Sequence, residues 1–221
     1  KQSALTEKLV QHGARVYIGH NATNIEGAQC VVYTSAVPPD NVELVAAQHN
    51  HIPVFTRAEL LAALMAEARC GIAVAGSHGK TTTTAMIGLM LDYAQLEPTV
   101  LLGGDLEAIH GNVKVGNGGY LVAEACEYYN SFLSLRPRIG VITNIDADHL
   151  DYFGNLNGVK EAFRQFARLL PADGYLVACY DDVNVQDVLP GLKCQVVTYG
   201  LAKEADWQAA NIELYAGGSS F

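Results

Sequence analysis

The chain has 221 residues, of which 50% are hydrophobic and 17% charged. This length suits one large α/β domain or two smaller ones, and the composition is that of a globular protein rather than a disordered one. Its 14 Lys and Arg against 23 Asp and Glu give a net charge of −9. That balance argues against a nucleic-acid duplex or an anionic membrane surface as partner. No apolar run approaches the roughly 18 residues that a membrane-spanning helix needs.

The five cysteines are odd in number, and no two of them form a C-x-x-C pair. Such a pattern is typical of reduced thiols in a reducing compartment. Residues 1–13 have an amphipathic helical pattern and lack the apolar stretch and cleavage site of a secretory signal. We therefore expect a cytoplasmic protein.

Short apolar runs rich in Val and Ile alternate with helical patterns along the chain. Apolar runs without polar alternation are typical of strands covered on both faces, so this order predicts an α/β fold with a mainly parallel sheet. The predicted strands are 14–18, 30–33, 52–55, 70–75, 120–123, 139–143, 175–179 and 195–199. The further predicted helices are 41–48, 57–68, 81–93 and 156–170.

A domain boundary is predicted at 67–71, where one helix ends and a new apolar strand begins. Residues 1–68 would then form a small α/β unit that lacks the first strand and turn of a mononucleotide-binding fold. Residues 69–221 would form the second domain.

One stretch of this second domain reads CGIAVAGSHGKTTTT, an apolar strand followed by a glycine loop and a helix. Gly76 and Gly79 allow successive backbone N–H groups to turn toward a phosphate at the helix N-terminus. Lys80, expected in an exposed position, would reach the β- and γ-phosphates of a nucleotide, and the Thr81 hydroxyl would bind Mg²⁺. Val74 holds the place of the first glycine of the strict motif, so a glycine-rich turn capped by threonine is the alternative.

Polar side chains follow the next two predicted strands. They are Glu124 and Glu127 after the first, and Asn144, Asp146, Asp148 and His149 after the second. Because ligands gather at the carboxyl ends of parallel strands, we expect these groups to converge on the glycine loop. Glu124 and His149 are the metal candidates, since Mg²⁺ prefers oxygen ligands and an adjacent Asp favours a metal or phosphate role for the histidine. The alternatives are a solvated strand end for Glu124 and a helix-cap or core role for His149.

The loop GSHGKTTTT, the run TNIDADHLDYF and the earlier YTSAVPPDN together resemble the Mur ligase family. The resemblance covers nearly the whole chain. It implies the C-terminal part of a Rossmann-like UDP-binding domain at 1–68, and a central P-loop ATPase domain at 69–221. His78 and the run TNIDADH are similar to the alanine-adding members. The implied activity is ATP-dependent amide formation between the lactoyl carboxylate of UDP-N-acetylmuramate and L-alanine, through an acyl phosphate, in peptidoglycan precursor synthesis.

The resemblance also implies roles for individual positions. The implied ATP-binding residues are Gly76, Ser77, His78, Gly79, Lys80, Thr81 and Thr82. Thr81 and Glu124 would hold one Mg²⁺, and His149 a second near the substrate carboxylate. Lys80 and His149 would be the catalytic residues. The implied substrate-binding residues are Ser35 and His78.

Some positions depart from the family pattern. Cys126 and Tyr129 replace two acids of a common EADESDxSF segment, which leaves the following acids without an implied role. Arg164 holds the place of a lysine that several members carbamylate. The resemblance further implies that the start of the UDP-binding domain and the amino-acid-binding third domain are missing, so we expect the chain alone to form no amide. A murein-peptide ligase of the same family and a non-catalytic P-loop regulator stay open as alternatives, and the sequence predicts no oligomeric state.

Overall fold

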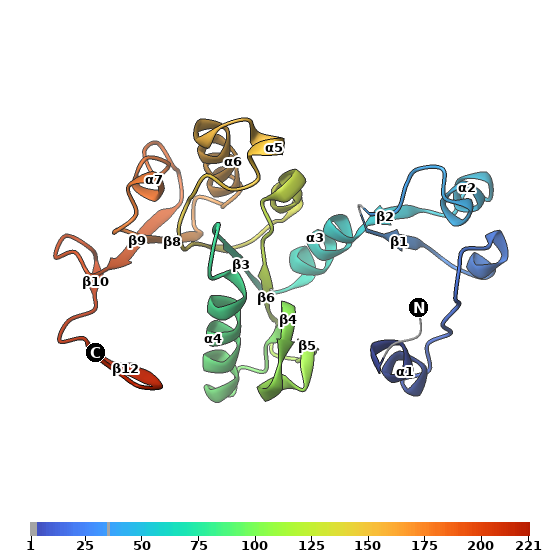
Figure 1. Cartoon of the computed structure of the whole chain (residues 1–221), viewed down its shortest axis with the longest axis horizontal. Helices are drawn as coiled ribbons and strands as arrows, with labels where there is room; N and C mark the ends of the chain where they lie inside the picture. Colours follow the sequence, from blue (N-terminus) through green and yellow to red (C-terminus); the bar gives the residue numbers. More distant parts are fainter. Residues whose placement is uncertain (1–3, 35) are drawn as a thin grey trace. The chain divides into compact units, whose positions relative to one another are not determined.

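The computed structural model describes residues 4–34 and 36–221 (Figure 1). The chain divides into two compact units, Lys1–Leu60 and Leu61–Phe221. The division falls inside helix α3 (Arg57–Glu67), so the domain limits at 68 and 69 stay a prediction. Across the residues given above, no helix is both long and apolar enough to cross a membrane.

The first unit contains two helices, a 3₁₀ turn and a small parallel sheet. Its elements are α1 (Ala4–Gln11), η1 (Ala22–Ile25), β1 (Val31–Tyr33), α2 (Val42–His49) and β2 (Val54–Thr56). Strands β1 and β2 pair in parallel, with Val31 opposite Val54. The predicted strand over 14–18 is wrong: within the described part of this unit only β1 and β2 pair, and a strand without a neighbouring ladder is not stabilised.

The second unit is built on an eight-stranded sheet in the order β10-β9-β8-β7-β3-β6-β4-β5. All neighbours are parallel except β4 and β5. The strands are β3 (Cys70–Ala75), β4 (Thr99–Leu106), β5 (Gly111–Lys114), β6 (Tyr120–Glu124), β7 (Ile139–Ile142), β8 (Tyr175–Cys179), β9 (Gln195–Gly200) and β10 (Trp207–Gln208). The predicted α/β fold with a mainly parallel sheet is therefore confirmed.

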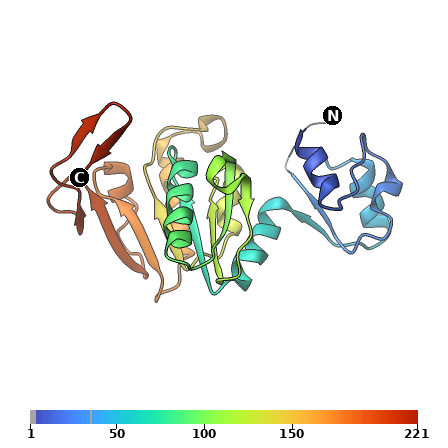
Figure 2. The ribbon, with the colours of Figure 1, turned by 90° about the horizontal axis from the view of Figure 1, so that it is seen from below.

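The helices between these strands cover the sheet. They are α4 (Lys80–Tyr93), η2 (Glu107–Ile109), η3 (Tyr128–Ser134), α5 (Leu150–Phe153), α6 (Leu156–Arg168) and α7 (Val183–Gln186). A separate antiparallel hairpin, β11 (Glu213–Tyr215) with β12 (Gly218–Ser220), follows β10. In Figure 2 the helix α4 lies along one face of the sheet.

The central strand β3 is buried on both of its faces. Ile72 and Val74 point to the side on which Ile87 of α4 packs, whereas Ala73 and Ala75 join the larger core formed with α6. This larger core contains Phe163 and other fully buried side chains. Burial of each large apolar side chain contributes about 1.5–3 kcal/mol to the free energy of folding. The core thus fixes β3 at the middle of the sheet, and the loop that follows Ala75 is held at the sheet's carboxyl edge.

Candidate functional site

The loop between β3 and α4 depends on two glycines with positive φ. At Gly76 (φ +145°) a Cβ atom would lie 1.9 Å from Oγ1 of Thr143, so no larger residue fits without moving the neighbouring strand. Gly79 (φ +78°) has a left-handed backbone and open space around it. Glycine is therefore favoured there by the backbone conformation and not by a lack of room for a side chain. These two constraints turn the chain sharply from the end of β3 into the first turn of α4.

Backbone donors at the start of α4 are free. Within residues 4–34 and 36–221, the N–H groups of Gly79, Lys80, Thr81 and Thr82 have no acceptor. The helix that follows is 14 residues long, so its dipole adds positive potential at the same point. Free N–H groups at the N-terminus of such a helix form an anion-binding site suited to phosphate.

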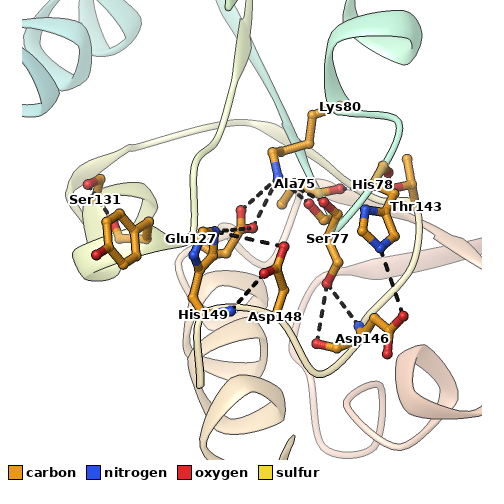
Figure 3. A network of polar contacts seen from close by, with 12 residues as sticks. Ala75, Ser77, His78, Lys80, Glu127, Ser131, Thr143, Asp146, Asp148 and His149 are labelled. Atoms are coloured by element: carbon orange, nitrogen blue, oxygen red, sulfur yellow. Dashed lines mark hydrogen bonds and ion pairs between the residues drawn. The ribbon is translucent and has the colours of Figure 1, made fainter. Parts of the chain in front are cut away.

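The loop residues Ser77 and His78 are braced by the segment after β7 (Figure 3). The N–H of Ser77 donates to the carbonyl of Asn144 at 3.0 Å, and the N–H of His78 donates to Asn144 Oδ1 at 2.8 Å. The Thr143 hydroxyl donates to the His78 carbonyl at 2.7 Å, and the N–H of Asp146 donates to Ser77 Oγ at 2.8 Å. The loop is therefore held in shape by the protein itself.

Lys80 is engaged with a buried acid. Its Nζ lies 3.0 Å from both carboxylate oxygens of Glu127 and 2.6 Å from the Gly76 carbonyl. The Lys80 side chain is only 18% exposed and that of Glu127 2%, so the expectation of an exposed lysine is wrong. The reason is that the acid following β6 reaches under the loop and supplies a counter-ion.

A cluster of possible metal ligands surrounds the same acid. One ligand atom each from Glu127, Asp148 and His149 lies within 4.8 Å of the others. His149 Nε2 is 3.7 Å from Glu127 Oε1 and 3.9 Å from Asp148 Oδ2, which is too far for hydrogen bonds. Two carboxylates and an imidazole that face one another without bonding form a donor set that fits a divalent cation.

Glu124 lies apart from this cluster. Its Oε1 accepts the N–H of Gly103 in β4, and a Cβ at that glycine would come within 3.0 Å of Oε2. The parallel register explains the placement: Glu124 pairs with Val74, before the glycine loop begins, whereas Glu127 lies three residues further along. The role of Glu124 as a metal ligand stays a prediction, and Glu127, which the sequence predicts to converge on the loop, is the acid that meets Lys80 and His149.

The other predicted site residues are spread around the loop. Thr81 and Thr82 lie in the first turn of α4, and the His78 side chain is 69% exposed, with Nε2 3.8 Å from Asp146 Oδ2. Beside His78 is a cavity of about 370 Å³, lined mainly by 144–146 and 181–184. Ser35 lies outside the described residues.

The strand, the braced glycine loop and the free N–H groups at the start of α4 define the class of α/β proteins with a phosphate-binding loop. A model of the Mur ligase middle domain matches residues 74–221, and one of the Mur ligase family catalytic domain matches residues 1–69. The chain therefore belongs to the Mur ligase family, as its motifs indicated.

Similar proteins point to a subgroup of this family. The chain is 52% identical over 212 residues to the UDP-N-acetylmuramate–L-alanine ligase of Caldanaerobacter subterraneus subsp. tengcongensis, covering 96% of this chain and 46% of that protein. The crystal structure of the Thermotoga maritima UDP-N-acetylmuramate-alanine ligase superposes with a TM-score of 0.77 at 30% identity, covering 92% of this chain and 46% of that one. The crystal structure of a UDP-N-acetylmuramate:L-alanyl-gamma-D-glutamyl-meso-diaminopimelate ligase from Neisseria meningitides superposes with a TM-score of 0.79 at 26% identity. The match covers 90% of this chain and 67% of that one. The chain thus spans about half the length of the curated relatives it matches.

Proposed function

We propose that this chain forms part of an ATP-dependent ligase that joins L-alanine to the lactoyl carboxylate of UDP-N-acetylmuramate. The observation that carries the proposal is the set of free N–H groups at the start of α4, with Lys80 beside them and Glu127 and His149 within reach. The two substrates are those in the name of the relative that is 52% identical. A cytoplasmic location is part of the proposal.

The phosphates of ATP would lie on the N–H groups of residues 79–82, and Lys80 would turn from Glu127 toward the β- and γ-phosphates. The γ-phosphoryl group would pass to the lactoyl carboxylate. A P–O bond to one carboxylate oxygen would form while the P–O bond between the γ-phosphorus and ADP breaks. The uncharged alanine amine would then attack the acyl carbon, the C–O bond to phosphate would break, and the proton lost from nitrogen would leave with the phosphate or to solvent. The ammonium of Lys80 offsets the repulsion between the two anions during transfer.

The metal ligands follow from the cluster around Glu127. Glu127, Asp148 and His149 would hold one divalent cation, and Thr81 and Glu124 remain the proposed holders of another. Mg²⁺ bound there would neutralise charge that develops on the phosphoryl oxygens. The cavity beside His78 is the proposed place for the nucleotide base, because it adjoins the loop and carries the amide groups of Asn144 and Asn184.

Nucleotide binding is tested by calorimetric titration of the chain with ATP and Mg²⁺. Lys80→Met should weaken binding at least about tenfold, because a charge-assisted contact to two phosphates is lost. Lys160→Met is the matched control, since Lys160 is also mostly buried but pairs with Asp187 away from the loop. Equal affinity in both variants would contradict the phosphate-loop assignment.

The reaction itself is tested on the protein encoded by the reading frame around these 221 codons. It is supplied with ATP, Mg²⁺ and UDP-N-acetylmuramate, together with either L-alanine or a murein tripeptide, and the amide product is detected by mass. Product with alanine supports the proposal. Product with the tripeptide alone supports the murein-peptide ligase, and nucleotide binding without any product supports a regulator.

A further inference from the structure

We propose that Tyr128 is the positioning residue for His149, with its phenol ring fixing the imidazole in the orientation that binds a cation. This role rests on the proposed function, because the cation site is part of that function. The ring of Tyr128 stacks on the imidazole, with centroids 4.4 Å apart and planes inclined by 30°. Glu127, the acid that Nε2 of His149 faces, is the residue immediately before Tyr128. Two consecutive residues therefore contact the same imidazole, one at its edge and the other at its face.

Among the described residues, no protein group supplies the hydrogen bond that usually orients a metal-binding histidine. Such a histidine donates its second ring N–H to a carboxylate, a carbonyl or water. For His149, both polar approaches within 4 Å are to Nε2, and none of residues 4–34 and 36–221 bonds to Nδ1. Its backbone is also left-handed, at φ +52°, which is uncommon outside glycine. The stacked phenol is therefore the contact that holds the ring plane.

Tyr128 is itself held from several sides. Its hydroxyl donates to Asp151 Oδ2 at 3.4 Å, and its carbonyl accepts the hydroxyl of Ser131 at 2.7 Å. Its ring packs on Tyr129, with centroids 4.2 Å apart, and meets Tyr152 edge-on at 6.2 Å. Because several contacts share this support, the ring stays in place when one of them is lost, and it can define the orientation of its neighbour.

The backbone of this segment is shaped to bring acid and ring together. Tyr129 (φ +52°) and Asn130 (φ +56°) are both left-handed, and the N–H of Asn130 donates to the Glu127 carbonyl at 2.9 Å. Left-handed non-glycine residues cost about 1–3 kcal/mol each and persist only where the surroundings impose them. The turn places the Glu127 carboxylate inside the protein and the Tyr128 ring against His149.

The test compares variants that separate the ring from the hydroxyl. Tyr128→Phe keeps the ring, and Tyr128→Leu and Tyr128→Gln remove it. Tyr152→Leu is the matched control, because Tyr152 belongs to the same aromatic group but has no ring contact with His149. Affinity for Mn²⁺ is measured by electron paramagnetic resonance on the folded chain. In the metal-free protein, the chemical shift of the His149 ring proton, identified with His149→Gln, reports the stacking.

Removal of the ring should weaken Mn²⁺ binding by about tenfold, the usual effect of losing a partner that orients a ligand. It should also move the His149 signal away from its ring-current-shifted position. Tyr128→Phe and Tyr152→Leu should leave both readouts within about twofold of the wild type. The role of Tyr128 is overturned, while the cation site stands, if both ring-free variants keep the wild-type Mn²⁺ affinity. It is overturned in the same way if Tyr152→Leu loses as much Mn²⁺ affinity as the ring-free variants do. A wild-type chain that binds no Mn²⁺ overturns the cation site and this role together.

Discussion

Replacing Lys80 with methionine is expected to destabilise the second unit by about 3 kcal/mol, near the lower end of the usual cost of breaking a buried ion pair. The carboxylate of Glu127 would keep its charge at 2% exposure while losing an ammonium 3.0 Å from both oxygens. The lower end applies because the Lys80 side chain is 18% exposed, so water already reaches the ammonium end of the pair. For a domain of this size, the melting temperature should fall by about 6–12 °C.

Urea unfolding followed by circular dichroism measures the loss, and a second lysine provides the control. Lys160 is 17% exposed, nearly the same as Lys80, and its Nζ is 2.6 Å from Asp187, but that partner is 53% exposed. Lys160→Met should therefore cost less than about 1 kcal/mol, as exposed pairs do. In the double variant Lys80→Met with Glu127→Gln, no buried charge is left unpaired. The double variant should therefore lose clearly less stability than the two single variants lose together. If Lys80→Met costs no more than Lys160→Met, the buried pair does not stabilise the unit and the reasoning fails.

Three further outcomes are expected. Gly76→Ala should cost about 2 kcal/mol or more in urea unfolding, because its Cβ would meet Oγ1 of Thr143 at 1.9 Å; a stable variant with normal ATP affinity would refute this. Glu124→Gln keeps an acceptor for the Gly103 N–H and should weaken the Mg²⁺ dependence of ATP binding at an unchanged unfolding midpoint, whereas unaltered dependence removes Glu124 from the ligand set. Burial raises the pKa of the Tyr199 phenol to about 12. Stability from its neutral form should be complete below about pH 10 and be lost as the pH rises through about 12, and Tyr199→Phe should remove that loss in high-pH unfolding curves.

The phosphate loop could be predicted from sequence because every part of its signal is local. An apolar strand, two glycines and a threonine-rich helix start occupy consecutive positions, and the structure has β3 and α4 at 70–75 and 80–93. The same holds for the helix α6, whose apolar residues recur on one face. Local patterns of this kind are independent of what the rest of the chain does.

The identity of the buried acid could not be read in the same way, because it depends on the register between two strands. Both Glu124 and Glu127 follow the same apolar run, and only the pairing of Glu124 with Val74 shows that the first acid stops short of the loop. This pairing is not visible in the sequence, so the two acids could not be told apart there. Strand β4 was missed for a related reason, since Gly103 and Gly104 interrupt its apolar pattern. The tertiary structure needs glycine there because the Glu124 carboxylate lies against Gly103.

The carboxylate of Glu127 has a consequence for how ligands influence one another. It is the counter-ion of Lys80 and also a member of the cation cluster, so its charge is shared between two binding events. A phosphate that draws Lys80 away leaves this charge available to a cation, and a cation on Glu127 releases Lys80 toward a phosphate. If both ligands bind as proposed, we expect the two affinities to be positively coupled, and by thermodynamic reciprocity each ligand would strengthen binding of the other by the same factor. In the proposed complex, one buried acid would thereby make nucleotide and metal bind cooperatively.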